Sequence, residues 1–154
     1  MKSIVRCATV DDLPQALVLG ERMRLESAVW YPEIDKEYFA GHYATILAHP
    51  DKFCCFVAQN GSNVVGWLNG FVSGYIFSPM QIAAHDVFYI APEARSYRTA
   101  RALVLAFVGW AEGLGLKRQV IRLDTGLKPD KVDLFYRRLG FQPIGGQYVR
   151  DGGD

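Results

Sequence analysis

Asn60-Gly61 separates two apolar runs and is the strongest turn signal in the chain. Residues 53–59 and 64–76 form these runs, and both are rich in the β-branched and aromatic side chains that strands favour. Because Asn-Gly fits the tight turn of a β-hairpin, we expect the two runs to pair antiparallel. Ser78-Pro79 should end the second strand, and residues 82–90 should form a third. The centre of the chain is therefore predicted to be a sheet.

The segments before this block are predicted to add one strand and two helices. Residues 3–8 alternate apolar and polar side chains, which indicates a half-buried strand. Thr9 and Asp12 have the spacing of a capping box, and the helix that follows should run to about residue 27. Asp35 should cap a second helix, which ends at His49-Pro50 because proline disfavours helical geometry in the preceding residue.

The segments after the block complete the predicted fold. An apolar stripe through residues 100–114 indicates a third helix, followed by a strand at 119–124, a short helix at 129–139 and one or two strands at 141–149. The element order β-α-α-β-β-β-α-β-α-β predicts an α/β (α+β) class with a mixed, partly parallel sheet and about four helices. The length suits one domain over residues 1–154.

The composition argues against several classes of protein. The net charge of +1 provides no global field for nucleic acid or an anionic membrane, so neither partner is expected. No stretch approaches the ~20 apolar residues of a membrane span, and the absence of a signal-peptide run at the N-terminus predicts a cytoplasmic protein. The histidines and cysteines lack metal-ligand spacing, so no metal is expected; Cys7, Cys54 and Cys55 are predicted to be reduced and buried.

The segment with the clearest chemistry lies where residues 82–90 lead into the third helix. Ile90-Ala91-Pro92 ends the strand, and a short loop brings Arg95, Arg98 and Arg101 to the start of the helix. Backbone N–H groups at a helix start lack internal partners, and the helix dipole adds partial positive charge. Such a terminus binds anions such as a pyrophosphate. The alternative is an ordinary strand-loop-helix unit whose arginines are solvated.

Residues 87–100 resemble the acetyl-CoA motif of the GNAT superfamily of acyltransferases, in which a strand and a proline precede Arg/Gln-x-x-Gly-x-Gly/Ala at a helix start. Arg95 matches the first position and Ala100 the last, whereas Arg98 replaces the central glycine. This Arg-x-x-Arg-x-Ala variant is similar to small phage-type GNAT proteins. The resemblance implies a mostly antiparallel sheet with a central, splayed parallel pair, and acetyl-CoA as co-substrate. It implies cofactor contacts from Phe88, Tyr89, Ile90, Arg95, Ser96, Tyr97, Arg98, Thr99, Ala100 and Arg101.

A second match lies at residues 134–141, which resemble the family's Leu-Tyr-x-x-Leu-Gly-Phe segment. The resemblance implies direct attack of a primary amine on the thioester, with a backbone N–H near Ile90 as donor to the oxyanion. Tyr136 takes the position of the tyrosine that points at the CoA sulfur, which makes it the general acid for the leaving thiolate. The alternative for Tyr136 is an amphipathic residue packed on the sheet.

For the base that deprotonates the amine, the candidates are Asp86 and His85. Side chains alternate along a strand, so Asp86 should share a face with Phe88 and Ile90. The family's base, where it has one, lies on that face, which favours Asp86 by resemblance. The alternatives are a structural carboxylate for Asp86 and a packed or exposed polar residue for His85.

The acceptor is predicted to bind beside the loop between the first two helices, as in such folds. Acidic and aromatic side chains there would suit a cationic amine on a small molecule or peptide, although a surface loop with aromatics tucked into the core explains them equally well. A catalytically inactive CoA-binding or protein-interaction module remains the alternative function, and a homodimer is a candidate assembly. The residues are Glu26, Trp30, Tyr31, Glu33, Asp35, Glu37, Tyr38 and Phe39.

Overall fold

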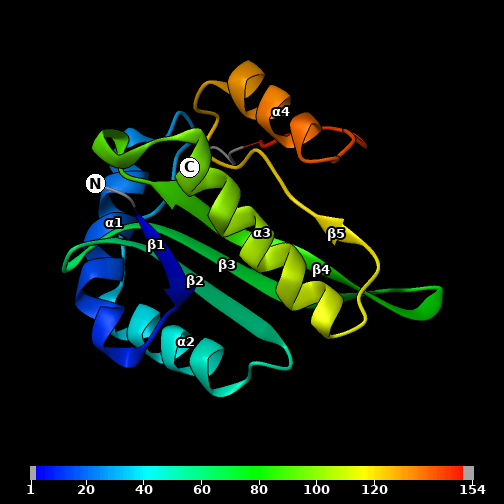
Figure 1. Cartoon of the computed structure of the whole chain (residues 1–154), viewed down its shortest axis with the longest axis horizontal. Helices are drawn as coiled ribbons and strands as arrows, with labels where there is room; N and C mark the ends of the chain where they lie inside the picture. Colours follow the sequence, from blue (N-terminus) through cyan, green and yellow to red (C-terminus); the bar gives the residue numbers. More distant parts are fainter. Residues whose placement is uncertain (1–2, 151–154) are drawn as a thin grey trace.

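A five-stranded sheet lies between two helical layers in the computed structural model, which describes residues 3–150 (Figure 1). Helices α1 and α2 cover one face, and α3 covers the other. None of the described helices is long and apolar enough to cross a membrane. The elements are β1 (Ile4–Cys7), η1 (Val10–Asp12), α1 (Leu13–Glu26), α2 (Lys36–Ala48), β2 (Phe53–Asn60), β3 (Asn63–Tyr75), β4 (Ser78–Ile90), η2 (Pro92–Ala94), α3 (Tyr97–Gly113), β5 (Gln119–Val120) and α4 (Pro129–Arg138).

The strands lie in the order β1-β2-β3-β4-β5, so each strand pairs with its sequence neighbour. The first three pairings are antiparallel, and β4 with β5 is parallel, as the mixed fold class predicts. Asn60 pairs with Asn63 across the predicted hairpin, where Gly61 has a φ of 57°. Glycine adopts that left-handed conformation without the clash that a Cβ would cause.

Local capping chemistry positions the first two helices as predicted. The Asp12 carboxylate accepts a hydrogen bond from the Thr9 N–H at 2.8 Å, which completes the capping box of η1, the turn that leads directly into α1. The Asp35 carboxylate accepts from the Tyr38 N–H at 2.9 Å at the start of α2. Both helices then pack on β2 and β3, so the loop between them is held at one end of the sheet.

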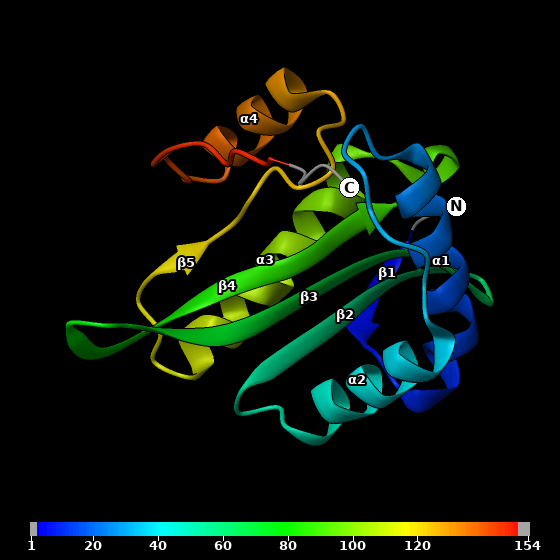
Figure 2. The ribbon, with the colours of Figure 1, turned by 180° about the vertical axis from the view of Figure 1, so that it is seen from behind.

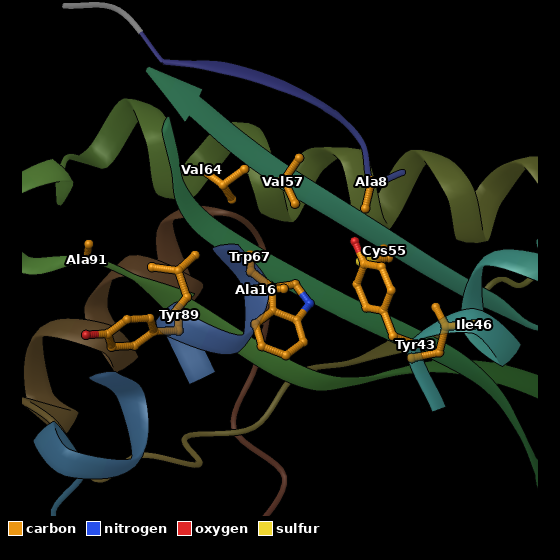
Figure 3. Packing of buried hydrophobic residues seen from close by; sticks show 11 residues of the cluster. Ala8, Ala16, Tyr43, Ile46, Cys55, Val57, Val64, Trp67, Tyr89 and Ala91 are labelled. Atoms are coloured by element: carbon orange, nitrogen blue, oxygen red, sulfur yellow. The ribbon is translucent and has the colours of Figure 1, made fainter. Parts of the chain in front are cut away.

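Two apolar cores lie on opposite faces of the sheet. Figure 3 shows the first, where Tyr43 of α2 and Trp67 of β3 pack beside Tyr89 of β4. The second core lies under α3, whose Leu103, Val104 and Phe107 are fully buried. Because successive strand residues point to opposite faces, the sheet contributes side chains to both cores.

The parallel pair is splayed. β4 pairs with β5 only where Ala83 and Ala84 face Gln119 and Val120, yet β4 continues to Ile90. The chain after β5 turns away toward α4 (Figure 2). The splay leaves the last residues of β4 without a second neighbouring strand, and a cavity fills that space.

Three sequence expectations differ from the structure. Ser78-Pro79 does not end a strand, because β4 starts at Ser78; Pro79 lies at a pairing irregularity opposite Gly74 and Tyr75, where no ladder N–H is needed. The strand expected at residues 119–124 shortens to Gln119–Val120, and the strands expected at 141–149 are absent from the described part of the chain. The parallel pair therefore lies at the edge of the sheet.

The cysteine prediction is correct for two residues and wrong for the third. Cys54 and Cys55 are free and buried, and burial raises the pKa of each thiol to about 12. Cys7 is free but exposed, because the last residue of β1 lies at the edge of the sheet. None of the three is a metal ligand or a disulfide partner in the described structure.

Candidate active site

A cavity of about 660 Å³ lies between the end of β4, the start of α3, and the chain from Arg122 through α4. This volume is typical of a small-molecule or cofactor site. Its lining combines apolar and aromatic side chains with basic groups. The residues are His85, Phe88, Tyr89, Ile90, Arg95, Ser96, Tyr97, Ala100, Arg122, Leu123, Asp124, Thr125, Gly126, Leu127, Lys128, Pro129, Lys131, Val132, Leu134, Phe135, Tyr136 and Arg138.

The start of α3 presents backbone donors to this cavity. The Ser96 hydroxyl caps the helix by accepting from the Thr99 N–H at 3.1 Å, and the first intrahelical bond runs from Ala100 N–H to Ser96 O. The N–H groups of Tyr97 and Arg98 have no partner among residues 3–150, as expected for the first turn. Together with the helix dipole, they make this terminus suited to an anion.

The cofactor-binding residues expected from the sequence divide into two groups. Seven line the cavity: Phe88, Tyr89, Ile90, Arg95, Ser96, Tyr97 and Ala100. Arg98, Thr99 and Arg101 do not belong to the lining. Thr99 is buried, and its hydroxyl instead bonds to those of Ser96 and Ser3.

Arg95 is anchored in a network that the sequence did not predict. Its guanidinium forms two hydrogen bonds to the Glu26 carboxylate, at 2.6 and 2.7 Å, and a third to the Ile90 carbonyl at 2.9 Å. It also lies 5.5 Å over the Tyr89 ring. The Arg95 hydrogen bonds hold the pKa of Glu26 below its usual value, with the Tyr89 hydroxyl adding to the effect. Arg95 thereby links α1 to the loop before α3.

The backbone N–H and C=O of Ile90 point into the gap between β4 and the chain after β5. Ala91 N–H bonds to the Val65 carbonyl of β3, whereas the Ile90 carbonyl bonds to Arg95 instead. In an antiparallel pair, hydrogen-bonded and non-hydrogen-bonded residues alternate, and the N–H and C=O of one residue point the same way. The Ile90 N–H is therefore directed away from β3 and toward the cavity.

A β-bulge changes the faces of the two base candidates. Asn69 pairs with Val87 and Gly70 with His85, so Asp86 is the extra residue. His85 thus lies on the α3 face with Phe88 and Ile90, while the alternation that favoured Asp86 does not hold across the bulge. Asp86 is exposed and outside the cavity lining, although its charge contributes to the raised pKa of Tyr31.

His85 makes a cross-strand contact to Asp124 that the sequence did not predict. Its imidazole is 1% exposed, Nδ1 accepts from the Arg122 N–H at 3.1 Å, and Nε2 lies 3.1 Å from Asp124 Oδ2. The usable signal was Asp124 itself, an acid at the carboxyl end of a strand expected to run parallel to β4. Carboxyl ends of parallel strands meet at one edge, where ligand sites gather.

Tyr136 is the one buried residue of α4, at 8% exposure. Its hydroxyl oxygen is 3.5 Å from the Arg122 carbonyl, at the limit of a hydrogen bond. Burial raises the pKa of Tyr136 above its ordinary value, and the Asp124 charge raises it further. A protonated phenol thus lines the cavity at neutral pH, and its role as the general acid stays a prediction.

The residues expected to line the acceptor pocket belong to the loop between α1 and α2 (the acceptor loop) and its flanks, and they do not all lie at the cavity. Tyr31 donates to the Asp124 carbonyl at 3.0 Å, which attaches the loop to the far wall of the cavity. Phe39 packs edge-on against Trp67 in the core, and Trp30 is 77% exposed. Among residues 3–150, no group of three or more histidine, cysteine or acidic side chains is arranged to hold a metal ion.

Comparisons with solved structures identify the architecture. A putative acetyltransferase from Agrobacterium tumefaciens matches with a TM-score of 0.76 and 22% identity over 96% of this chain and 99% of that chain. Glucosamine-6-phosphate N-acetyltransferase from Arabidopsis thaliana matches with a TM-score of 0.78 and 10% identity over 98% and 99%. A predicted acetyltransferase from Clostridium acetobutylicum, solved with acetyl-CoA, matches with a TM-score of 0.76 and 14% identity over 97% and 96%.

The sequence itself gives the family. No curated protein sequence matches significantly, but the family model described as the acetyltransferase (GNAT) domain matches residues 51–143. That range contains β2 to β4, α3, β5 and α4, including both motifs from which the resemblance was drawn. The chain therefore belongs to the GNAT family of N-acetyltransferases.

Proposed function

We propose that this chain, acting as one domain over residues 1–154, transfers an acetyl group from acetyl-CoA to a primary amine by direct attack on the thioester. The observation that carries the proposal is the cavity between β4 and α4. Ser96, Tyr97 and Ala100 at the start of α3 and Tyr136 of α4 all line this cavity, and the Tyr97 N–H has no partner among the described residues.

The pyrophosphate of acetyl-CoA would lie at the start of α3. The Tyr97 and Arg98 N–H groups are suited to its oxygens, and Arg95 has two guanidinium hydrogens left after its bonds to Glu26 and Ile90. The lining supplies further positive charge from Lys128, Lys131 and Arg138. A helix terminus and basic walls together fit a polyanionic co-substrate.

The chemistry needs three proton or charge adjustments. The amine must lose a proton before attack, and Asp86 remains the base predicted from the sequence. As the nitrogen–carbon bond forms, charge develops on the thioester oxygen, where the Ile90 N–H is a suitable donor. The carbon–sulfur bond then breaks, and the Tyr136 hydroxyl would give its proton to the departing thiolate.

The alternative function is CoA binding without catalysis. Arg98 in place of the motif glycine motivates this alternative, because a side chain at that position changes the approach of backbone to phosphate. Arg98 is exposed and is not among the residues that line the cavity, so its side chain does not occupy the cavity. The geometry therefore favours the catalytic proposal.

Calorimetry with acetyl-CoA, followed by thiol release over an amine panel, tests the proposal. The panel contains putrescine, lysine, glucosamine 6-phosphate, kanamycin and a peptide with a free N-terminus. We expect micromolar acetyl-CoA binding and thiol release with at least one amine. Binding without thiol release would support the alternative, and no binding would contradict both functions.

Arg95→Ala should weaken acetyl-CoA binding by about 1.5–3 kcal/mol, the usual loss for a charged hydrogen bond. Arg22→Ala is the matched control, because Arg22 forms a similar two-point pair with Glu93 at 2.7 and 2.8 Å outside the cavity lining. Equal calorimetric affinities for the two variants would contradict the placement of the pyrophosphate.

A further inference from the structure

His85 and Asp124 form a polar contact in a cavity whose other charged side chains are all basic. Nδ1 of His85 accepts the Arg122 N–H, so this nitrogen holds a lone pair and the ring proton resides on Nε2. Nε2 then donates to Asp124 Oδ2 at 3.1 Å. His85 is 1% exposed, so the imidazole is held in this orientation and aims its proton at the carboxylate.

Asp124 is fixed from its other side by the loop between α1 and α2. The Tyr31 hydroxyl donates to the Asp124 carbonyl at 3.0 Å. The Ala28 N–H and the Ser27 hydroxyl donate to the carbonyl of the next residue, Thr125, at 2.9 and 3.0 Å. The backbone of Asp124 is therefore held where β5, the acceptor loop and the cavity meet, while its side chain keeps 22% exposure.

The charges along the cavity separate two regions. Asp124 is the one acidic side chain in the described lining, which otherwise carries Arg95, Arg122, Lys128, Lys131 and Arg138. An anionic co-substrate suits the basic groups, whereas an ammonium ion is attracted to Asp124 and repelled elsewhere. Asp124 lines the same cavity as Tyr136, the phenol expected to face the thiolate, and its charge adds to the raised pKa of that phenol.

We infer that the Asp124 carboxylate, oriented by His85, binds the ammonium group of the acceptor and takes the proton that the amine must lose. This inference rests on the proposed acetyl transfer and replaces Asp86 as the proton acceptor. His85 is a positioning residue, because its Nε2 already carries a proton and its Nδ1 is occupied.

The protons balance as follows. The acceptor R–NH₃⁺ gives one proton to Asp124, and the resulting R–NH₂ forms a bond to the thioester carbon. The nitrogen loses its second proton to water as the carbon–sulfur bond breaks, and Tyr136 protonates the thiolate. Asp124 returns its proton to solvent and Tyr136 is reprotonated from solvent, so one proton is released per acetyl group transferred.

Groups from several elements surround Asp124. His85 contacts it from β4 and the Tyr31 hydroxyl bonds to its carbonyl from the loop between α1 and α2, while Arg122 and Tyr136 line the same cavity. Asp86 lies outside the lining, and its charge acts with that of Asp124 on the Tyr31 phenol. Burial and the charges of Asp124 and Asp86 raise the pKa of Tyr31, so this phenol is neutral at physiological pH. Asp86 is the competing carboxylate, and the variants below separate it from Asp124.

Asp124→Asn preserves shape but cannot accept the proton. With the fastest amine of the panel, it should lower kcat/KM by about 10²-fold or more, with acetyl-CoA affinity unchanged. Asp51→Asn, an exposed aspartate remote from the lining, is the control and should match the wild type. The inference would be overturned if kcat/KM of Asp124→Asn stayed within threefold of the wild type. It would also be overturned if Asp86→Asn lowered kcat/KM as much as or more than Asp124→Asn.

His85→Gln retains an N–H donor for Asp124, and His85→Leu removes it. If His85 acts through Asp124, His85→Leu should move the acidic limb of the kcat/KM–pH profile to higher pH, since a donated hydrogen bond favours the ionised carboxylate. His85→Gln should restore much of the wild-type profile. Identical profiles in two folded variants would overturn the positioning role.

A binding measurement covers the case in which no panel amine is acetylated. In protein labelled with ¹⁵N-histidine and saturated with CoA, putrescine should shift the His85 Nε2 resonance in the wild type but not in Asp124→Asn. That result would retain the ammonium site while rejecting acetyl transfer. Absence of both turnover and any putrescine-dependent shift would reject the inference together with the function.

Discussion

Residues 3–113 and residues 114–150 are built in different ways. The first part contains four strands, two of them 13 residues long, and nearly all of the buried core. In the second part the only strand has two residues, and among its described residues only Leu116 and Tyr136 are buried. The two parts form opposite walls of the cavity.

Because of this difference, the two parts contribute different groups to the cavity. The β4–α3 wall presents backbone groups together with the side chains of His85 and Arg95, and long strand pairing and a buried helix hold them in place. The wall after β5 presents side chains, including Asp124, Lys131 and Tyr136. Regions with few buried contacts open most easily, so the second wall is the one able to adjust to a ligand. Variants in the buried core of the first part should therefore change stability, and variants of the cavity-lining side chains of the second part should change chemistry.

Tyr136→Phe should have the largest effect, and on rate rather than folding. The ring and its contacts with Phe135 and Phe141 remain, while the proton for the thiolate is removed. We expect kcat to fall by roughly 10²–10⁴-fold with little change in acetyl-CoA affinity. Single-turnover rates with an identified acceptor measure this change. Equal rates across the pH range would remove Tyr136 from the mechanism and support the non-catalytic alternative.

Phe107→Ala should lower stability and leave the catalytic rate unchanged, the converse of Tyr136→Phe. Phe107 is fully buried between α3 and the sheet, so its truncation leaves a cavity and should cost about 3–5 kcal/mol of unfolding free energy. Urea unfolding measures this loss. At temperatures where the variant is folded, its kcat should remain near that of the wild type. A small stability loss with a large loss of kcat would show that the two parts are not separable in this way.

The same division explains what the sequence could predict. Asn60-Gly61 and the Asp35 cap depend on neighbours within a few residues, and both were predicted correctly. The bulge at Asp86 depends on how β4 registers against Gly70, and an added Cβ on Gly70 would approach Phe107 within 2.6 Å. That constraint is set by α3 across the sheet, so strand periodicity alone did not reveal it.

The side-chain contacts at the cavity could not be predicted from the sequence for a related reason. The Glu26–Arg95 pair spans 69 positions and the His85–Arg122 bond 37, so no local pattern encodes them. The motif at residues 95–100 was found because a helix start is local, and the cavity contains Arg95, Ser96, Tyr97 and Ala100 as expected. The strands expected at residues 141–149 failed because an apolar pattern does not guarantee a pairing partner.

Asp12→Asn, in the first part, should cause a loss of unfolding free energy smaller than that of Phe107→Ala. Arg6 makes two hydrogen bonds to the buried Asp12 carboxylate, at 2.7 and 2.8 Å, and holds the pKa of Asp12 below its usual value against the opposing effect of burial. Substitution should cost about 1–3 kcal/mol. Since the pKa of Asp12 is lowered on folding, its contribution is present above the unfolded pKa of about 4 and is lost as pH falls through the folded value.

Urea unfolding between pH 3 and 7 checks both parts of this expectation. The wild type should lose stability toward pH 3 more steeply than Asp12→Asn, which lacks the titrating carboxylate. Asp133→Asn is a control, because Asp133 pairs with Arg137 on the exposed side of α4. Parallel pH profiles for the wild type and Asp12→Asn would show that the Arg6 contact contributes nothing to stability.

Tyr148→Ala should have the smallest effect and tests the second part directly. Tyr148 is fully exposed, and neighbouring Ile144 and Val149 are 73% and 77% exposed, so the ring has no packing to lose. We expect a change in unfolding free energy within about 0.5 kcal/mol, as is usual for surface sites. A loss above about 1 kcal/mol would instead mean that residues 141–149 pack in solution, as their apolar pattern first suggested. Hydrogen exchange at Gln147 and Tyr148 distinguishes these cases, since unpaired amides exchange rapidly and paired strand amides are protected.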